Sequence, residues 1–156
     1  MKEIIIYNII AATLAAAVLI PLAAASTSSY ASQKEEVYHA ARGGGDKLRS
    51  ILAEGISINS IDESGSTALM EAAERNKEEI VRVLVNNGAN VDMQNEQGET
   101  ALMIAAESGA TEIVSLLLDA NADPDIRDRK GETALQKAEE KGHSDTSGVI
   151  GRAGGH

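Results

Sequence analysis

The stretch GSTALM at residues 65–70 decides the fold, because it returns twice further along the chain. It reads GETALM at residues 98–103 and GETALQ at residues 131–136, so the three copies begin at equal intervals. An alanine pair follows the first two copies at the same distance, at residues 72–73 and again at 105–106. Self-similarity at a fixed period predicts a protein built by stacking copies of one small structural unit.

The residue types within each copy predict a turn followed by two helices. A glycine supplies the positive φ that a tight turn needs, and a threonine two positions later is suited to N-cap the helix that follows. After the alanines, an I-V-x-x-L pattern at residues 80–84 and 113–117 places apolar side chains on one face of a second helix. Gly88 and Asn121 follow these second helices, and both residue types favour a left-handed cap.

A 33-residue period with a G-x-T-x-L turn, an alanine pair and an I-V-x-x-L helix resembles the ankyrin repeat. The resemblance implies an all-α solenoid of helix-turn-helix units with β-turn fingertips. The family usually has T-P-L-H in the turn, whereas this chain has T-A-L-M twice and T-A-L-Q once. The histidine-mediated hydrogen bonds of that turn are therefore absent, and methionine suits an apolar replacement at a buried position.

The repeat divides the chain into four expected units. Residues 32–62 form a degenerate N-terminal unit, in which Gly43, Gly44 and Gly45 are interpreted as an inter-helix turn. Residues 63–95 and 96–128 are two regular repeats, and residues 129–156 form a C-terminal capping unit with a partly disordered tail. The second helix of that last unit is expected to fray, because Gly148 and Gly151 interrupt it.

Residues 1–31 are interpreted as a secretory signal peptide. Residues 4–22 are almost wholly apolar, and a small-residue stretch suited to a signal peptidase follows them. An uncleaved membrane anchor is the alternative, because the apolar run approaches the length that spans a bilayer. Either interpretation places the folded part outside the cytoplasm. A small exported bacterial protein of the periplasm is expected, with an anchored or a secreted protein as alternatives.

The net charge of −10 limits the classes of partner. Such an acidic chain repels nucleic acid and anionic lipid head groups, whereas it attracts basic proteins. We therefore expect no nucleic-acid partner and no membrane contact beyond an N-terminal anchor. A monomer is also expected. Simple solubility is the competing explanation of the charge.

No residue pattern for catalysis, a cofactor or a metal ion stands out. The chain has no Cys, and its three His residues, His39, His143 and His156, are dispersed. A lone His without a carboxylate or thiolate partner at ligand spacing is usually structural or solvated. We therefore predict no catalytic, cofactor-binding or metal-binding residues and do not expect an enzyme.

The remaining candidate site is a surface. In proteins that resemble this one, partners contact the fingertip turns and the exposed side of the first helices, which line a concave face. Carried onto this sequence, the partner-binding residues are Glu63, Ser66, Glu71, Glu74, Arg75, Glu96, Glu99, Ile104, Glu107, Ser108, Arg129, Lys130, Glu132 and Glu140, with Ser64, Gln97, Lys137 and Lys141 beside them. A face of merely solvated charges is the competing interpretation.

These features predict an adaptor or regulator of the cell envelope that binds a basic protein segment in an acidic groove. The groove is expected to run from negative in the first two repeats to nearly neutral in the last. An immunity or inhibitor protein that neutralises a toxin or phospholipase is the alternative, as is a secreted effector.

Overall fold

The computed structural model describes residues 44–53 and 55–154, and this part of the chain is a stack of helix pairs. It holds helices and one isolated antiparallel bridge between Ile61 and Thr67. The predicted signal segment at residues 1–31 and most of the expected first half of the N-terminal unit, up to residue 43, lie outside the described residues. The helices are α2 (Gly45–Ala53), α3 (Ala68–Glu74), α4 (Glu78–Asn86), α5 (Ala101–Glu107), α6 (Thr111–Asp119), α7 (Ala134–Glu140) and α8 (Ser144–Ala153).

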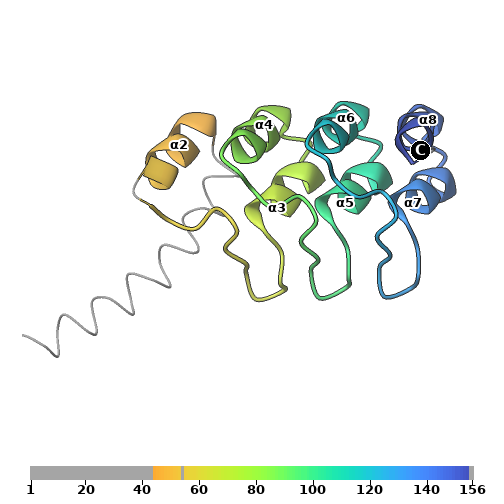
Figure 1. Cartoon of the computed structure of the whole chain (residues 1–156), viewed down its shortest axis with the longest axis horizontal. Coiled ribbons are helices and arrows are strands. Elements are labelled where there is room, and N and C mark those ends of the chain that lie inside the picture. The colour runs from red at the N-terminus through yellow and green to blue at the C-terminus, as the bar shows by residue number, and fades with distance from the viewer. Residues whose placement is uncertain (1–43, 54, 155–156) are drawn as a thin grey trace, which may run out of the picture. The chain divides into compact units, whose positions relative to one another are not determined.

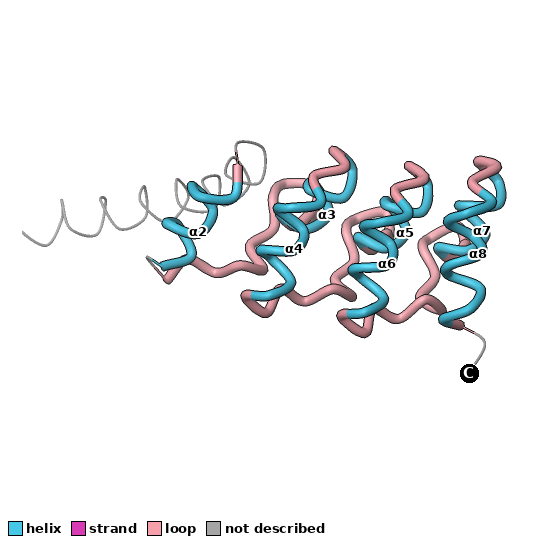
Figure 2. Tube along the Cα trace, turned by 90° about the horizontal axis from the view of Figure 1, so that it is seen from above, coloured by secondary structure: helices cyan, strands magenta, loops and turns pink. Residues whose placement is uncertain are grey.

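The helices form two rows. The short helices α3, α5 and α7 make one row, and α2, α4, α6 and α8 make the other (Figure 1). Seen from above, successive helix pairs repeat the same arrangement (Figure 2). Three long loops project on the side of the first row, and we call them finger 1 (residues 57–67), finger 2 (90–100) and finger 3 (123–133). This is the all-helical architecture that the sequence predicts.

Each finger passes into its helix through the predicted glycine and threonine. The φ angles of Gly65, Gly98 and Gly131 are 73°, 80° and 83°, where a side chain would be strained. The hydroxyl of Thr67 accepts a hydrogen bond from the N–H of Met70 at 3.3 Å, and the same cap recurs at Thr100 and Thr133. The capping prediction is confirmed.

Methionine takes part in the turn in a way that the sequence does not suggest. The sulfur of Met70 accepts a hydrogen bond from the backbone N–H of Thr67 at 3.4 Å. In the last repeat the side-chain oxygen of Gln136 accepts from the N–H of Thr133 at 3.0 Å. Met70 is 2% exposed and Met103 1%, so the expected apolar replacement at a buried position is confirmed.

The core is made of aliphatic and small side chains between the two rows. The alanine pairs at residues 72–73 and 105–106 are fully buried, and Leu84, Ile113 and Leu117 are also fully buried. Because alanine carries only a methyl group, the first helices of neighbouring units approach closely there. The stack therefore buries a continuous core that a single unit could not form.

Backbone hydrogen bonds also join neighbouring fingers. The N–H of Glu96 donates to the carbonyl of Ser64, and the N–H of Arg129 donates to the carbonyl of Gln97, both at 3.0 Å. At Gly98, a Cβ atom would lie only 2.9 Å from the backbone nitrogen of Arg129. Glycine is therefore required at this position for close packing as well as for its φ angle.

Both end units differ from the sequence-based expectation. Gly45 is the first residue of α2, so the interpretation of residues 43–45 as a turn is wrong for this residue. The last helix, which we expected to fray, is present as the ten-residue α8. Ile150 is 1% exposed, and the hydroxyl of Thr146, also 1% exposed, lies 2.8 Å from that of Thr111. These contacts with the preceding unit compensate for the weak helix propensity of the glycines.

The second helices of the two regular repeats end in left-handed caps. Asn121 has a φ of 62° and Gly88 one of 82°, so both predicted left-handed caps are confirmed. Among the described residues, no helix combines the length and the apolar character needed to cross a membrane.

Candidate functional site

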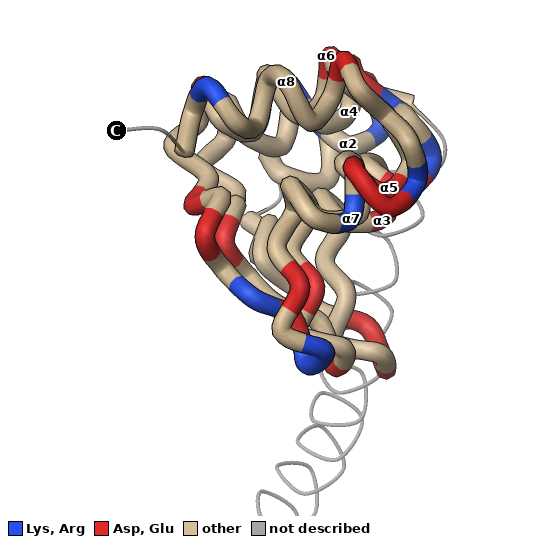
Figure 3. The backbone as a smooth tube through the Cα atoms, turned by 90° about the vertical axis from the view of Figure 1, so that its right-hand side faces the viewer, with Lys and Arg blue, Asp and Glu red and all other residues tan. Residues whose placement is uncertain are grey.

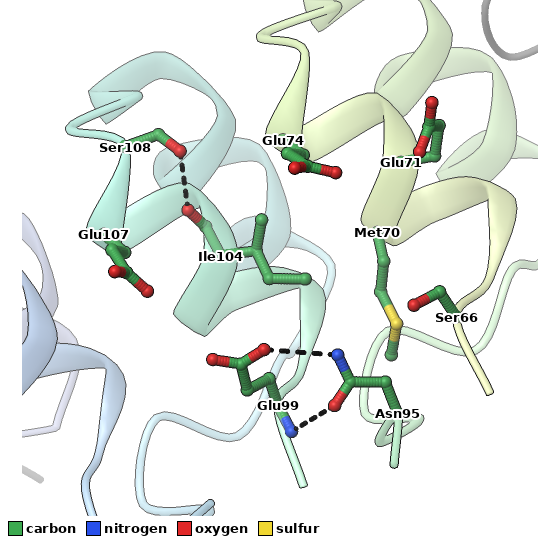
Figure 4. A pocket seen from close by; sticks show the side chains of 9 residues that line it. All are labelled: Ser66, Met70, Glu71, Glu74, Asn95, Glu99, Ile104, Glu107 and Ser108. Atoms are coloured by element: carbon green, nitrogen blue, oxygen red, sulfur yellow. Dashed lines mark hydrogen bonds between the residues drawn. The ribbon is translucent and has the colours of Figure 1, made fainter. Parts of the chain in front are cut away.

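A cavity of about 420 Å³ opens between α3 and α5, beside fingers 1 and 2. We call it the α3–α5 pocket, and we call the whole surface formed by the fingers and by α3, α5 and α7 the groove. The side chains that line the pocket come from two neighbouring repeats (Figure 4). They are Ser66, Met70, Glu71, Glu74, Asn95, Glu99, Ile104, Glu107 and Ser108.

Most of these residues were predicted from the sequence as partner-binding positions; the two that were missed are Met70 and Asn95. Met70 was assigned only to the buried turn. Asn95 is not among the predicted positions, although it lies one repeat period from both Asp62 and Asp128. All three begin a finger turn, in which the side-chain oxygen accepts two backbone N–H groups; for Asn95 these belong to Gln97 and Glu99. The shared register was the signal that could have identified Asn95.

Glu71 departs from the prediction, because it is buried. Only 4% of it is exposed, and its carboxylate is paired with the guanidinium of Arg75 one helical turn away. Position 71 corresponds in the repeat to Ile104 and Lys137, both of which are also partly or fully covered. Glu71 is therefore a buried, paired side chain of the pocket lining and not an exposed contact in the groove.

Lys137 was also assigned to the exposed groove, and this assignment is wrong. The residue is 5% exposed, and four carboxylates surround its ammonium group. The Nζ atom of Lys137 lies 3.0 Å from a carboxylate oxygen of Glu99 and 3.0 Å from one of Asp128. The nearest carboxylate oxygens of Glu107 and Glu132 are 3.7 Å and 3.8 Å away. A buried ammonium is tolerated only when it is paired in this way. We call these five residues the Lys137 cluster.

The cluster shifts the pKa values of its members. Burial by itself lowers the pKa of Lys137, but hydrogen bonds to Glu99 and Asp128 outweigh it and raise that pKa. Burial likewise tends to raise the pKa of Asp128, but hydrogen bonds from the backbone of Glu132 and from Lys137 lower it overall. A hydrogen bond from Lys141, at 3.0 Å, lowers the pKa of Glu107. These three groups are therefore charged at neutral pH.

Much of the expected acidity of the groove is thus neutralised by the chain itself. Lys137 and Lys141 pair with Glu99, Glu107 and Glu132, and Arg75 pairs with Glu71. Glu74 differs, because it is exposed and has no ion pair with any residue in the described part of the chain. Acidic and basic positions lie close together on helices and fingers alike (Figure 3).

The remaining predicted residues lie outside the pocket. Glu63 and Glu96 are exposed on fingers 1 and 2, and Arg129 occupies the equivalent exposed place on finger 3 with Lys130 next to it. Glu140 is exposed on α7. The fingertips therefore carry negative charge in the first two repeats and positive charge in the third.

The described residues contain no group of three or more His, Asp or Glu side chains suited to holding a metal ion. His143, the His among them, has its Nε2 atom 3.1 Å from the carbonyl oxygen of Glu107, which ties the last repeat to the one before it. The arrangement offers charged, polar and apolar contacts for recognition.

Comparison with protein families gives one assignment that covers most of the chain. The family model for ankyrin repeats (3 copies) matches residues 37–128 and residues 87–148, well over half of the 156 residues. A search of the curated proteins finds no match. Ankyrin repeats are general protein-protein interaction modules and typically have no enzymatic activity. Repeat, capping pattern and family model agree, and the chain belongs to the ankyrin-repeat family.

Proposed function

We propose that this protein is an adaptor or regulator that binds a basic segment of another protein in its groove. The observation that carries the proposal is the α3–α5 pocket, where the exposed carboxylate of Glu74 has no cation from the described part of the chain. The other carboxylates of the pocket are already paired with Arg75, Lys137 or Lys141. The carboxylate of Glu74 is therefore suited to pair with a positively charged group of a partner.

The charge of the whole chain supports a basic partner. A net charge of −10 attracts positively charged proteins over distances comparable to the Debye length, which is about 8 Å at physiological salt. Glu63 and Glu96 add exposed negative charge on the two fingers that flank the pocket. The interaction would therefore form fastest at low salt and weaken as salt rises.

The cell envelope is the proposed place of action, on the basis of the export signal predicted at residues 1–31. In that compartment the partner would be another exported protein or an envelope enzyme. The same groove would serve an inhibitor of an incoming toxin equally well, and the identity of the captured protein distinguishes the two roles.

Reversing the charge of the groove should abolish most of the binding. In a pull-down from envelope extract, the tagged full chain is compared with a Glu74→Lys/Glu96→Lys variant, both changes being at exposed positions. We expect retention of the partner to fall about tenfold or more, which corresponds to ~1.4 kcal/mol or more of binding free energy. Raising salt from low to physiological concentration should weaken the native complex as well.

A matched control carries the same change in net charge away from the groove. The variant Glu112→Lys/Asp119→Lys alters two exposed residues of α6, in the other helix row. It should retain the partner as the native chain does. Equal loss in both variants would mean that net charge alone matters, and the groove would no longer be the proposed site.

A further inference from the structure

The chain contains an internal example of a lysine side chain bound between two repeats. In the gap between α5 and α7, the ammonium of Lys137 lies among Glu99, Glu107, Asp128 and Glu132 at 3.0–3.8 Å. Glu99 and Glu107 belong to the second regular repeat, and the others belong to the third finger, which leads into the last unit. The gap between two first helices of this protein is therefore able to hold a lysine side chain.

The α3–α5 pocket is the same site one repeat earlier. Counting back one repeat period from the four carboxylates around Lys137 leads to Ser66, Glu74, Asn95 and Glu99, and all four line the pocket. Counting back from Lys137 leads to Ile104, which also lines it. The pocket thus keeps the position of the lysine site, but an isoleucine stands where the chain's own lysine would be.

The groups that remain in the pocket suit a cation with an apolar stem. Glu74 supplies a carboxylate, and Ser66 supplies a hydroxyl. Glu99 supplies a second carboxylate, which it shares with the ammonium of Lys137 on the other side. The side-chain amide of Asn95 donates to Glu99 at 3.2 Å and holds that carboxylate in place (Figure 4). Ile104 points into the space between Glu74 and Asn95, and Met70 lies across from it (Figure 4). Both side chains line the pocket and offer it apolar surface.

We propose that the α3–α5 pocket receives a single lysine side chain of the partner. The ammonium lies between Ser66, Glu74 and Glu99, and the methylene stem lies along Met70 and Ile104, since lysine covers apolar surface with its stem while its charged end stays polar. This inference rests on the proposed function and names the group that the groove recognises. Lysine is favoured over arginine because the internal example is a compact ammonium and not a planar guanidinium.

The first test uses a defined probe on the full chain. The probe is a short Gly/Ser peptide with one central lysine, and its twin has norleucine in that place. In NMR titrations, the lysine peptide should shift the methyl signal of Ile104 and the side-chain amide of Asn95, whereas the norleucine peptide should not. Equal behaviour of the two peptides, or no shift at millimolar concentration, would overturn the proposal.

An internal lysine should close the pocket. The variant Ile104→Lys recreates the position of Lys137, so its own ammonium would occupy the site and the lysine peptide should no longer bind. Glu112→Gln changes the net charge by the same amount on α6 and should bind the peptide normally. An Ile104→Lys chain that still binds the lysine peptide contradicts the proposal.

A gain-of-function variant covers the case in which Ile104→Lys fails to fold. Asn95→Asp recreates Asp128 of the occupied site and should tighten lysine-peptide binding several-fold. Asn90→Asp adds the same charge at an exposed loop position and should leave binding nearly unchanged. Equal effects of the two variants would show that only net charge matters, and the specific pocket would be rejected.

These tests separate the pocket from the wider function. A partner protein whose retention depends on Glu74 and Glu96, but not on Ile104→Lys, would leave the adaptor proposal standing and remove the lysine pocket. If the lysine peptide binds but no partner protein depends on Glu74 and Glu96 for its retention, the lysine pocket stands and the adaptor proposal is removed.

Discussion

Replacing Lys137 with methionine is expected to destabilise the protein by about 3–5 kcal/mol, because it removes one partner of a buried charge cluster. The side chain of Asp128 is only 3% exposed and would lose the cation 3.0 Å away. Glu99, Glu107 and Glu132 would then repel one another without a central positive charge. Urea unfolding at neutral pH measures the loss. A variant as stable as the native chain would contradict the account of the cluster.

A second substitution should restore much of this stability. In Lys137→Met/Asp128→Asn, the amide keeps the oxygen that accepts the turn hydrogen bonds from Lys130 and Glu132 but no longer carries a buried charge. The double variant resembles the preceding repeat, where Asn95 and Ile104 occupy these positions. Recovery in the double variant would assign the loss to unpaired charge and not to packing.

The same cluster sets the pH range of the stabilisation. The pKa values of Asp128 and Glu107 lie below their ordinary values of 3.8 and 4.5, so their contribution is present above those values and is lost as pH falls through the lowered pKa values. The pKa of Lys137 is raised above 10.5, so its contribution is present below 10.5 and is lost only at still higher pH. The native free energy of unfolding should therefore fall more steeply below pH 4.5 than that of the double variant.

Substituting alanine for Gly98 should be the other large effect, and Gly131 provides its control. Both residues have nearly the same φ, 80° and 83°, where a residue with a Cβ is destabilised by about 1–2 kcal/mol. At Gly98 the new Cβ would also lie 2.9 Å from the nitrogen of Arg129, whereas no atom lies within 4 Å at Gly131. We expect Gly98→Ala to cost an additional ~1–3 kcal/mol from overpacking.

Urea unfolding of the two alanine variants separates conformational strain from contact between fingers. The difference between the two losses in free energy of unfolding measures the cost of crowding at Gly98. There the fingers approach each other closely enough for the N–H of Arg129 to donate to the carbonyl of Gln97. Equal losses at the two positions would mean that the fingers move apart at little cost, and that they contribute little to the rigidity of the groove.

The local structure of the repeats could be predicted from the sequence because it depends on residues close together in the chain. The conformations of Gly98 and Asn121 and the capping role of Thr100 follow from intrinsic preferences that neighbouring units do not alter. The last helix was underestimated, because contacts such as Thr146 with Thr111 join residues from different repeats and outweigh local propensity.

The candidate site was predicted less well, because burial of a charged residue depends on partners from other repeats. Lysine is almost never fully buried unless it is paired, so Lys137 was assigned to the surface. Its partners Glu99 and Asp128 are distant in sequence but converge when the repeats stack. The sequence does hold a signal for this burial. Lys137 lies one repeat period after Ile104, and acidic residues occupy the neighbouring positions of the repeat. The pattern of free and neutralised carboxylates in the groove follows largely from that one residue.

The most direct test of the central claim, that the groove binds a basic protein segment, is site-specific photo-crosslinking in cells. A photoreactive amino acid replaces Ser108 at the rim of the α3–α5 pocket, or Asp119 on α6 as the control. The account predicts a crosslink from position 108 to a lysine-bearing segment of one protein, and no such product from position 119. The same product from both positions, or none from position 108, would contradict it.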